Sequence, residues 1–285
     1  MTTTALLQRI RLDRAPAGPS AEGLFVLHRA FVTSIPYESV QYQFGGGGPL
    51  DPRVVAARMI AREAGGYCFQ MNGAFALLLS ELGYQVTMHR GGVQTRSVPA
   101  ARVDSTHLVL TVTDLPEAPE QVWLVDAGLG DGLLEPLPLE VGATRQMPYD
   151  FRLGPSSVTA GWRLEHDARS VIVGMDFESA PATLDDFAER HAHLSTAADS
   201  PFVRAASVFL RRPDSVLALR SRELAETFAD RIDTTVLETQ TEYYELLADV
   251  FQLPLPHLGP AQRDQLWRRV VQQYDDYLAR VANPG

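Results

Sequence analysis

The chain has a single cysteine, Cys68, and the stretch around it constrains the fold more than any other part of the sequence. Two glycines, Gly65 and Gly66, come shortly before the cysteine, and apolar residues at helical spacing follow it as far as Gly83. This order predicts a turn that enters a helix, with the cysteine in the first helical turn. Unpaired backbone N–H groups and the positive end of the helix dipole favour a thiolate at that position, so we expect a reactive thiol.

Helical spacing dominates the chain as far as Gly83. Ser20 is a suitable N-cap for one helix and Asp51 for another, in which Pro52 takes the first helical position. The glycines between these two helices are typical of a flexible loop. The helices expected here cover Ala5–Leu12, Ala21–Ser34, Pro52–Glu63 and 68–82, and the glycine loop covers Gly45–Gly48.

From Tyr84 onward the sequence is rich in Val and Leu and is divided by Pro, Asp and Gly, as in a series of β-strands. We expect an antiparallel sheet or small barrel followed by a mixed tail, and hence an α+β fold. The expected strands are Tyr84–Val93, His107–Val112, Gln121–Val125, Met147–Leu153, Gly161–His166 and Ser170–Phe177. The elements expected after them are a helix at Leu184–His193, a strand at Val203–Leu210, and helices at Thr241–Phe251 and Pro260–Val281.

The composition argues against several classes of function. The net charge is −10, lysine is absent and the arginines form no basic stripe, so the chain does not indicate a nucleic-acid partner. We find no apolar run of a signal peptide or a membrane span, and one cysteine cannot form an internal disulfide, so we expect the cytoplasm. His191 and His193 point apart on a helix, and no residue set has the spacing of a zinc site, so no metal is expected.

A nucleophilic cysteine needs a base, and the base needs an orienting group. His107 begins one predicted strand and Asp126 follows another, so two adjacent strands of one sheet would bring these side chains together. If the helix of Cys68 packs its N-terminus against that pair, Asp126 fixes the tautomer of His107, and His107 holds the thiolate. The thiolate would attack a thioester or amide carbonyl, with the backbone N–H of Cys68 as an oxyanion donor.

Each of the three residues also has an ordinary structural explanation. A lone cysteine on a helix is commonly a small buried apolar residue, and a histidine on a strand is commonly structural. An aspartate before glycine is commonly a turn residue. Separation along the sequence does not measure distance in the fold, so spacing alone leaves these explanations open.

Short motifs in the first half of the chain resemble those of the arylamine N-acetyltransferase family. The family's cysteine motif is matched by Gly65-Gly66-Tyr67-Cys68-Phe69-Gln70-x-Asn72, and its histidine motif by Ser105-Thr106-His107-Leu108. The aspartate motif is matched by Val125-Asp126-Ala127-Gly128-x-Gly130, and the I-P-F-E-N signature resembles Ile35-Pro36-Tyr37-Glu38. The motifs occur in family order, and the resemblance weakens in the second half of the chain.

The resemblance implies a helical bundle, a central antiparallel β-barrel and a C-terminal α/β lid, with a papain-like catalytic core. The three parts would cover residues 1–84, 85–195 and 196–285. The nucleophile would lie in the first part, and the histidine and aspartate in the second. A lid would keep water away from a reactive thioester.

The resemblance also implies a chemistry. The triad would consist of Cys68, His107 and Asp126, and an acetyl group would pass from acetyl-CoA to an arylamine or hydrazine by a ping-pong mechanism. Acetyl-CoA or another acyl thioester is then a co-substrate, and no bound cofactor is implied. Arylamines are weak bases that stay neutral at pH 7, so they can discharge the acyl-enzyme while His107 removes the proton.

The family pattern assigns binding positions as well. The positions that match its substrate pocket are Tyr37, Val93, Thr106 and Leu129. Backbone amides at Gly128 and Gly130 could hold the donor's pyrophosphate, although a plain turn also explains two nearby glycines.

Three positions depart from the family pattern. Ser39 replaces the asparagine of the I-P-F-E-N signature. Ala64 replaces an arginine that is expected to pair with Glu38, so we expect Arg9 or Arg62 to take that role. Leu129 replaces a phenylalanine of the acceptor pocket, which indicates a different or larger pocket.

Three further functions stay open beside arylamine acetylation. Some relatives are amide synthases that take an acyl chain from a carrier protein, and the Gly45–Gly48 loop and Leu129 would suit a longer acyl group. A thiol hydrolase would use the same triad with water, and a non-catalytic relative would keep the fold alone. The sequence identifies neither the acyl donor, nor the amine, nor the oligomeric state.

Overall fold

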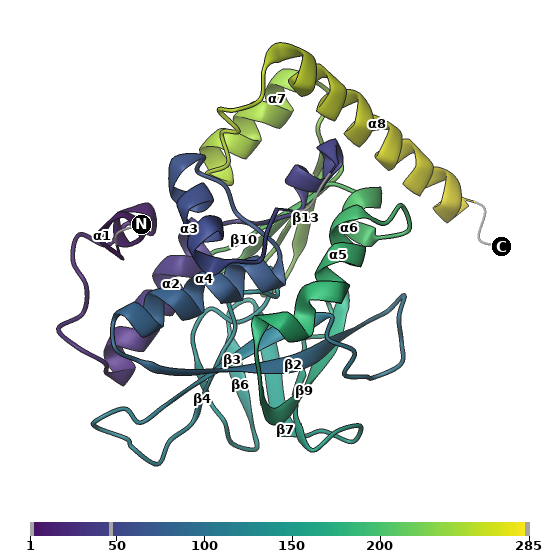
Figure 1. The fold of residues 1–285 in the computed structure, drawn as a ribbon. Helices are drawn as coiled ribbons and strands as arrows, with labels where there is room; N and C mark the ends of the chain where they lie inside the picture. The colour runs from purple at the N-terminus through teal and green to yellow at the C-terminus, as the bar shows by residue number, and fades with distance from the viewer. Residues whose placement is uncertain (1–2, 46–47, 283–285) are drawn as a thin grey trace.

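The computed structural model describes residues 3–45 and 48–282. Figure 1 shows an antiparallel sheet at the bottom of the view, the N-terminal helices α2, α3 and α4 across the middle, and the C-terminal helices α7 and α8 at the top. In this view the N-terminal helices therefore lie between the large sheet and the C-terminal helices α7 and α8. No helix within the described ranges is long and apolar enough to cross a membrane.

Helix α4 (Cys68–Glu81) is the central element of the N-terminal part. It begins at Cys68 after the extended residue Tyr67, as the glycine turn predicts, and nearly its whole length is buried. Its apolar side chains form one cluster with those of α2 (Ala21–Ser34) and of the strand that carries His107. The nucleophile candidate is thus anchored by a helix that packs on both neighbours.

The predicted N-caps of the two other long helices are confirmed. The side chain of Ser20 accepts a hydrogen bond from the Gly23 amide at the start of α2, and that of Asp51 accepts one from the Arg53 amide. The first helix begins and ends earlier than expected, and Gly46 and Gly47 of the glycine loop lie outside the described residues. The remaining elements of this part are α1 (Thr3–Arg9), η1 (Val40–Phe44) and α3 (Pro52–Ala61).

The middle of the chain forms an eight-stranded antiparallel sheet with strand order β5-β4-β3-β2-β9-β8-β7-β6. Since β5 and β6 are edge strands that do not pair with each other, the sheet is open. The expected antiparallel sheet is confirmed, and the barrel that the family resemblance implies is present as a curled half-barrel. Its strands are β2 (Gln85–Thr95), β3 (His107–Thr113), β4 (Trp123–Val125), β5 (Leu137–Pro138), β6 (Gly142–Gln146), β7 (Tyr149–Pro155), β8 (Gly161–Glu165) and β9 (Ile172–Ala182).

A second sheet has five strands in the order β1-β10-β11-β12-β13. Its edge strand β1 (Tyr37–Glu38) comes from the part expected to be mostly helical and pairs with β10 (Ser207–Arg211). Strands β11 to β13 were not predicted. The other elements are η2 (Leu184–Phe187), α5 (Ala188–Thr196), α6 (Pro201–Arg204), β11 (Val216–Arg220), β12 (Glu223–Thr227), β13 (Ile232–Val236), α7 (Gln240–Glu245), η3 (Leu246–Val250) and α8 (Pro260–Ala282).

One strand prediction is partly wrong. The expected strand Val203–Leu210 begins only at Ser207, because Ser200 caps a short helix in which Pro201 takes the first position. The local capping signal therefore overrides the apolar run at its start.

The buried guanidinium of Arg211 joins the two sheets. It donates hydrogen bonds to the carbonyl oxygens of Gly132 and Gln146, at 3.0 Å each, and to that of Met147. On its own side it donates to the carbonyl of Ser215 at 3.2 Å. Only 2% of the residue is exposed, so these carbonyls have no water to replace the arginine.

We predict that Arg211→Met lowers the free energy of unfolding by about 3 kcal/mol or more, because several buried carbonyls lose their donor. The matched control is Arg212→Met, which breaks a partly exposed ion pair with Glu226 and should cost less than about 1 kcal/mol. Urea-induced unfolding of both variants measures the difference. Equal losses in the two variants would contradict the proposed bridge between the sheets.

Candidate active site

Cys68 lies at the first position of α4, where its side chain faces the large sheet. Its Sγ atom is 3.5 Å from the carbonyl oxygen of Thr106, the residue that precedes strand β3. Only 3% of the residue is exposed. The turn before it is fixed by the neighbouring chain, since Tyr37 bridges Gly66 and the Glu38 amide donates to the Gly66 carbonyl at 2.9 Å.

His107 and Asp126 meet as the strand prediction requires. His107 begins β3, Asp126 directly follows β4, and the two strands pair antiparallel with Leu110 opposite Val125. Nε2 of His107 is 2.7 Å from Oδ2 of Asp126, and each residue is 1% exposed. Because Nε2 is hydrogen-bonded to Asp126, the other ring nitrogen, Nδ1, remains available to interact with Cys68.

The surroundings of His107 keep its ring protonated. Burial lowers the pKa of His107, but the charge and hydrogen bond of Asp126 outweigh it, and the hydrogen bond and charge of Cys68 add to the increase. Together they raise the pKa of His107 to about 10. An imidazolium braced by a carboxylate favours a thiolate as its neighbour.

Asn72 completes the support of the aspartate. Its Nδ2 donates to Oδ1 of Asp126 at 3.0 Å and to the carbonyl of Leu108 at 2.6 Å, while its Oδ1 accepts from the Ala127 amide at 2.8 Å. The residue is fully buried. Asn72 belongs to the cysteine motif, but we assigned it no role from the sequence; its spacing of one helical turn from Cys68 was the available signal.

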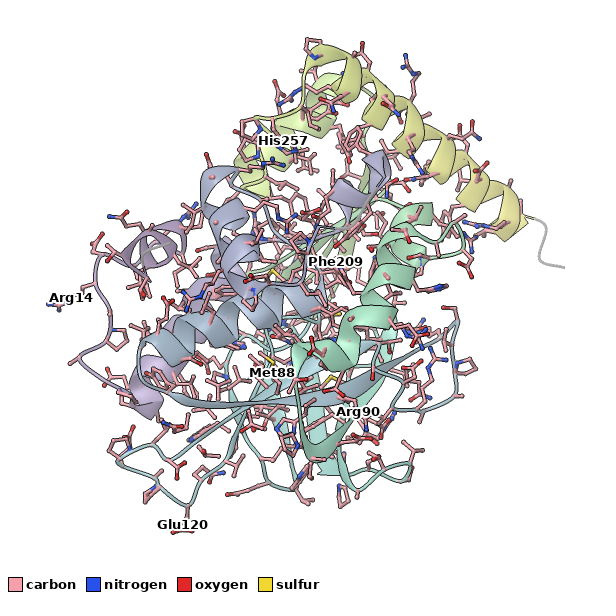
Figure 2. The ribbon with its side chains drawn as sticks, in the orientation of Figure 1. Arg14, Met88, Arg90, Glu120, Phe209 and His257 are labelled. Atoms are coloured by element: carbon pink, nitrogen blue, oxygen red, sulfur yellow. The ribbon has the colours of Figure 1, made fainter. Side chains whose placement is uncertain are left out.

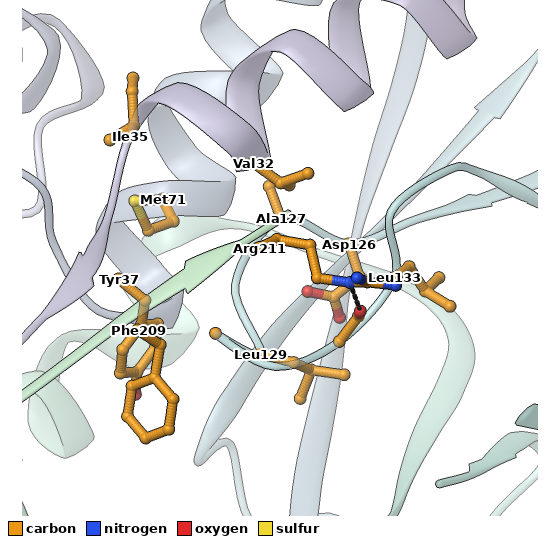
Figure 3. A pocket seen from close by; sticks show the side chains of 12 residues that line it. Val32, Ile35, Tyr37, Met71, Asp126, Ala127, Leu129, Leu133, Phe209 and Arg211 are labelled. Carbon is orange, nitrogen blue, oxygen red and sulfur yellow. Dashed lines mark hydrogen bonds between the residues drawn. The ribbon is translucent and has the colours of Figure 1, made fainter. Parts of the chain in front are cut away.

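The four pocket positions from the sequence fall into two places. Thr106 adjoins Cys68 through its carbonyl, and its Oγ1 accepts a hydrogen bond from the Val93 amide at 3.4 Å. Tyr37 and Leu129 line a small cavity behind Asp126 (Figure 3). That cavity holds about 10 Å³, which is room for about one water molecule.

The backbone of the turn after Asp126 supports the carboxylate of that residue. The Gly128 amide donates to Oδ1 of Asp126 at 2.7 Å, so it is not available to a phosphate, in contrast to our expectation. A side chain at Gly128 would meet Nδ2 of Asn72 at 2.7 Å and the backbone of Cys68 at 3.0 Å, so this position requires glycine. Gly130 has a φ of +80° and lies against the ring of Tyr37.

The expected ion pair of Glu38 with Arg9 or Arg62 is wrong. Within the described ranges no cation lies within 4.0 Å of the Glu38 carboxylate, and Arg9 donates instead to the Ser34 carbonyl at 2.9 Å. Burial raises the pKa of Glu38, and the charge of Arg58 partly opposes that increase. Arg58 in turn donates to the Gly65 carbonyl at 2.7 Å, so it supports the glycine turn from one helix earlier.

The site therefore brings together a thiol, an imidazolium and a carboxylate, the groups needed for nucleophilic acyl transfer. In the part of the chain that the structure describes, no three His, Cys, Asp or Glu side chains are grouped as a metal site requires. His191, considered earlier for a metal, instead contacts the Tyr67 hydroxyl and lies 2.7 Å from the Gly48 carbonyl.

Comparisons with known proteins agree on one family. Residues 21–258 match the model of an N-acetyltransferase family. An arylamine N-acetyltransferase of Mycolicibacterium smegmatis is 31% identical over 89% of this chain and 92% of its own length. The structure of Mycobacterium marinum arylamine N-acetyltransferase in complex with CoA superposes with a TM-score of 0.84, at 26% identity, over 95% of this chain and 99% of that one.

We predict that Asp126→Asn lowers the pKa of His107, because the charge that raises it is removed while burial remains. Nitrogen NMR of the imidazole should show a protonated ring at about pH 8 in the parent and a neutral ring in the variant. His89, on the neighbouring strand, is the control whose titration should not change. A parent His107 that is already neutral at that pH would contradict this account.

The raised pKa of His107 also predicts how the stability of the fold changes with pH. The folded-state pKa of about 10 exceeds the ordinary value of 6.5, so the stabilisation from protonated His107 is complete below pH 6.5 and is lost as the pH rises toward 10. The difference in unfolding free energy between the parent and Asp126→Asn should therefore narrow over that interval. A difference in unfolding free energy that widens as the pH rises from 6.5 to 10 would contradict this prediction.

Proposed function

Because the chain belongs to the arylamine N-acetyltransferase family of acyltransferases, we propose that it moves an acetyl group from acetyl-CoA through Cys68 to an arylamine or related amine. The observation that carries the proposal is the 2.7 Å contact between His107 and Asp126 at the N-terminus of the helix that bears the only cysteine. The relative whose structure contains CoA supports a CoA thioester as the donor.

In the first half of the proposed reaction, the Cys68 thiolate attacks the carbonyl carbon of the thioester. A new bond forms between Sγ and the acyl carbon, and the bond to the sulfur of CoA breaks. The leaving CoA thiolate takes the proton of the His107 imidazolium. The backbone N–H of Cys68 stands at the first helical position, where the helix offers it no acceptor, so it can donate to the developing oxyanion.

In the second half, the neutral amine attacks the acyl-enzyme. His107, now neutral, removes the proton from the attacking nitrogen as the new amide bond forms. The bond between the acyl carbon and Sγ then breaks, and the thiolate–imidazolium pair is restored. Asp126 keeps Nε2 occupied throughout, so Nδ1 performs each proton transfer.

Water must be kept from the acyl-enzyme for an amine to compete. The near-complete burial of Cys68 and His107 supports this, and we propose that residues 196–285 serve as the lid. Phe202 of α6 packs against Tyr67, directly before the nucleophile, with ring centroids 4.9 Å apart. We also propose that the chain works in the reducing cytoplasm, where its single thiol stays free.

A longer acyl group, as in an amide synthase, gains little support. The side chain of Leu129 is 7% exposed and packs among buried residues, so it does not open a larger pocket. The other supporting feature, the glycine loop, is partly outside the described residues. A carrier protein as donor is therefore the second hypothesis.

The proposed mechanism predicts a covalent intermediate. Incubation with acetyl-CoA should add one acetyl group to Cys68, detectable by mass spectrometry of the intact chain, and an arylamine should remove it. Cys68→Ala should show no adduct, and His107→Gln should load at least about a hundredfold more slowly. The absence of an adduct with every thioester would refute the proposal, and rapid clearance by water alone would support a thiol hydrolase.

A donor series tests the choice of acyl group. We expect acetyl-CoA to load Cys68 about tenfold faster than thioesters of longer chains, because the residues around the triad are tightly packed. Leu129→Ala should reduce this preference, and Leu139→Ala, a more remote change in the same cluster, is the control. Slow loading by acetyl-CoA with fast loading by long or carrier-bound chains would favour the amide synthase.

A further inference from the structure

One contact outside the triad joins the second half of the chain to the residue before the proposed nucleophile. Nδ1 of His191, on α5, meets the hydroxyl of Tyr67, and the two rings are stacked with centroids 5.9 Å apart and an interplanar angle of 9°. Figure 1 shows α5 beside α4, and in Figure 2, drawn in the same orientation, side chains occupy the space between the two helices. The mechanism proposed for Cys68 does not use His191.

The hydrogen bonds of His191 determine the direction of this contact. Nε2 lies 2.7 Å from the carbonyl oxygen of Gly48, which can only accept, so Nε2 carries the proton of the ring. Burial lowers the pKa of His191, and the bond to Gly48 partly opposes that decrease, so the ring is neutral at pH 7 and its Nδ1 is an acceptor. The Tyr67 hydroxyl therefore donates to Nδ1 of His191.

The buried ring of Tyr67 needs this acceptor. The residue is fully buried, and its ring packs against Tyr42, Phe69 and Phe202 at centroid distances of 5.5, 5.2 and 4.9 Å. Burial raises the pKa of Tyr67, so its hydroxyl keeps the proton and stays a donor. Because a buried hydroxyl without a partner costs free energy, the contact with His191 selects one position of the ring among those that packing allows.

The backbone of Tyr67 controls the start of α4. Tyr67 is the extended N-cap residue, and its carbonyl accepts hydrogen bonds from the amides of Gln70 and Met71 at 2.9 Å each. Its side chain makes no capping hydrogen bond within the helix, so that side chain is held from α5 instead. The next amide belongs to Cys68 and is the proposed oxyanion donor. A rotation of the Tyr67 backbone would move both this amide and the sulfur relative to the imidazole of the triad.

The residue before His191 reaches a second segment beside the sulfur. Arg190 donates to the carbonyl of Asp104 at 3.3 Å and lies 3.6 Å from its carboxylate. That carboxylate accepts from the Thr106 hydroxyl at 2.7 Å, and the Thr106 carbonyl lies 3.5 Å from Sγ of Cys68. Two consecutive residues of α5 thus support segments that adjoin Cys68.

We propose that His191 is a positioning residue for the nucleophile: it holds the Tyr67 hydroxyl and so fixes the backbone from which Cys68 and its amide enter α4. The inference rests on the proposed function, because it takes Cys68 as the reacting group. His191 acts through Tyr67 and touches none of the reacting atoms. The proposal gives α5, which lies beyond the family motifs in the sequence, a role in the reaction.

Two substitutions separate the roles of the two ring nitrogens. His191→Asn places an amide oxygen near the position of Nδ1, so it keeps an acceptor for Tyr67 and loses the donor to Gly48. His191→Gln places an amide nitrogen near the position of Nε2, so it keeps that donor and loses the acceptor. We expect the maximal rate of Cys68 acylation by acetyl-CoA to fall about tenfold in His191→Gln and in Tyr67→Phe, with an unchanged half-saturation concentration, and less than about twofold in His191→Asn.

A double variant and an exposed histidine provide the controls. Tyr67→Phe combined with His191→Gln removes both partners of one contact, so its acylation rate should match that of either single variant. His193→Gln changes the same residue type on the same helix, where the side chain is 46% exposed, and should leave the rate unchanged. Losses that multiply in the double variant, or equal losses in His191→Asn and His191→Gln, would overturn the proposal.

Alkylation of Cys68 separates this proposal from the proposed function, because iodoacetamide reacts without an acyl donor. If the sulfur moves away from the imidazolium, less of it is thiolate, so alkylation at about pH 6 should be about fivefold slower in His191→Gln and Tyr67→Phe than in the parent or His191→Asn. Equal rates in all four proteins would overturn the positioning role even if acetyl-CoA acylates Cys68. Slower alkylation in those two variants, with no acylation by any thioester, would support the positioning role and refute the proposed function.

Discussion

The buried carboxylate of Asp126 is the group on which the candidate site depends. A carboxylate so far from water is stable only when strong donors replace its hydration. Three donors from three segments meet it: the His107 ring, the Asn72 amide and the Gly128 backbone. A single charge therefore fixes a strand, a helix and a turn relative to one another, and the low dielectric around it strengthens each bond.

That charge also determines the chemistry at the sulfur. Helix α4 supplies both Cys68 and Asn72, so the helix whose Asn72 donates to the aspartate also carries the proposed nucleophile. Asp126 raises the pKa of His107, so in the proposed mechanism the protonated ring would be the proton donor for the leaving thiolate. The same packing encloses the site. An acyl thioester there needs this protection from water if an amine is to react with it first.

Much of this arrangement follows from local signals in the sequence. Ser20, Asp51 and the glycine turn begin helices through contacts within a few residues, and His107 and Asp126 meet because their strands are neighbours in both sequence and sheet. The family resemblance rested on the same local motifs.

Contacts between distant segments were not predictable in this way. Nothing near Tyr37 signals that it pairs with Phe209, and nothing near Arg211 signals that its acceptors lie in the turns of the large sheet. The presence of Arg58 near Glu38, where Arg9 or Arg62 was expected, has the same cause, because it depends on how helix α3 packs beside strand β1. The sequence left a sheet and a small barrel as alternatives, because strand alternation indicates a sheet but does not determine whether its edges close.

The most direct test of the account is the pH dependence of Cys68 alkylation by iodoacetamide, measured in the parent and in His107→Gln. If the imidazolium holds the sulfur as thiolate, the parent should react rapidly at about pH 6, and the variant should react much more slowly there. A parent that reacts slowly at that pH and accelerates only with the ionisation of an ordinary thiol, near about pH 8.5, would contradict the central claim.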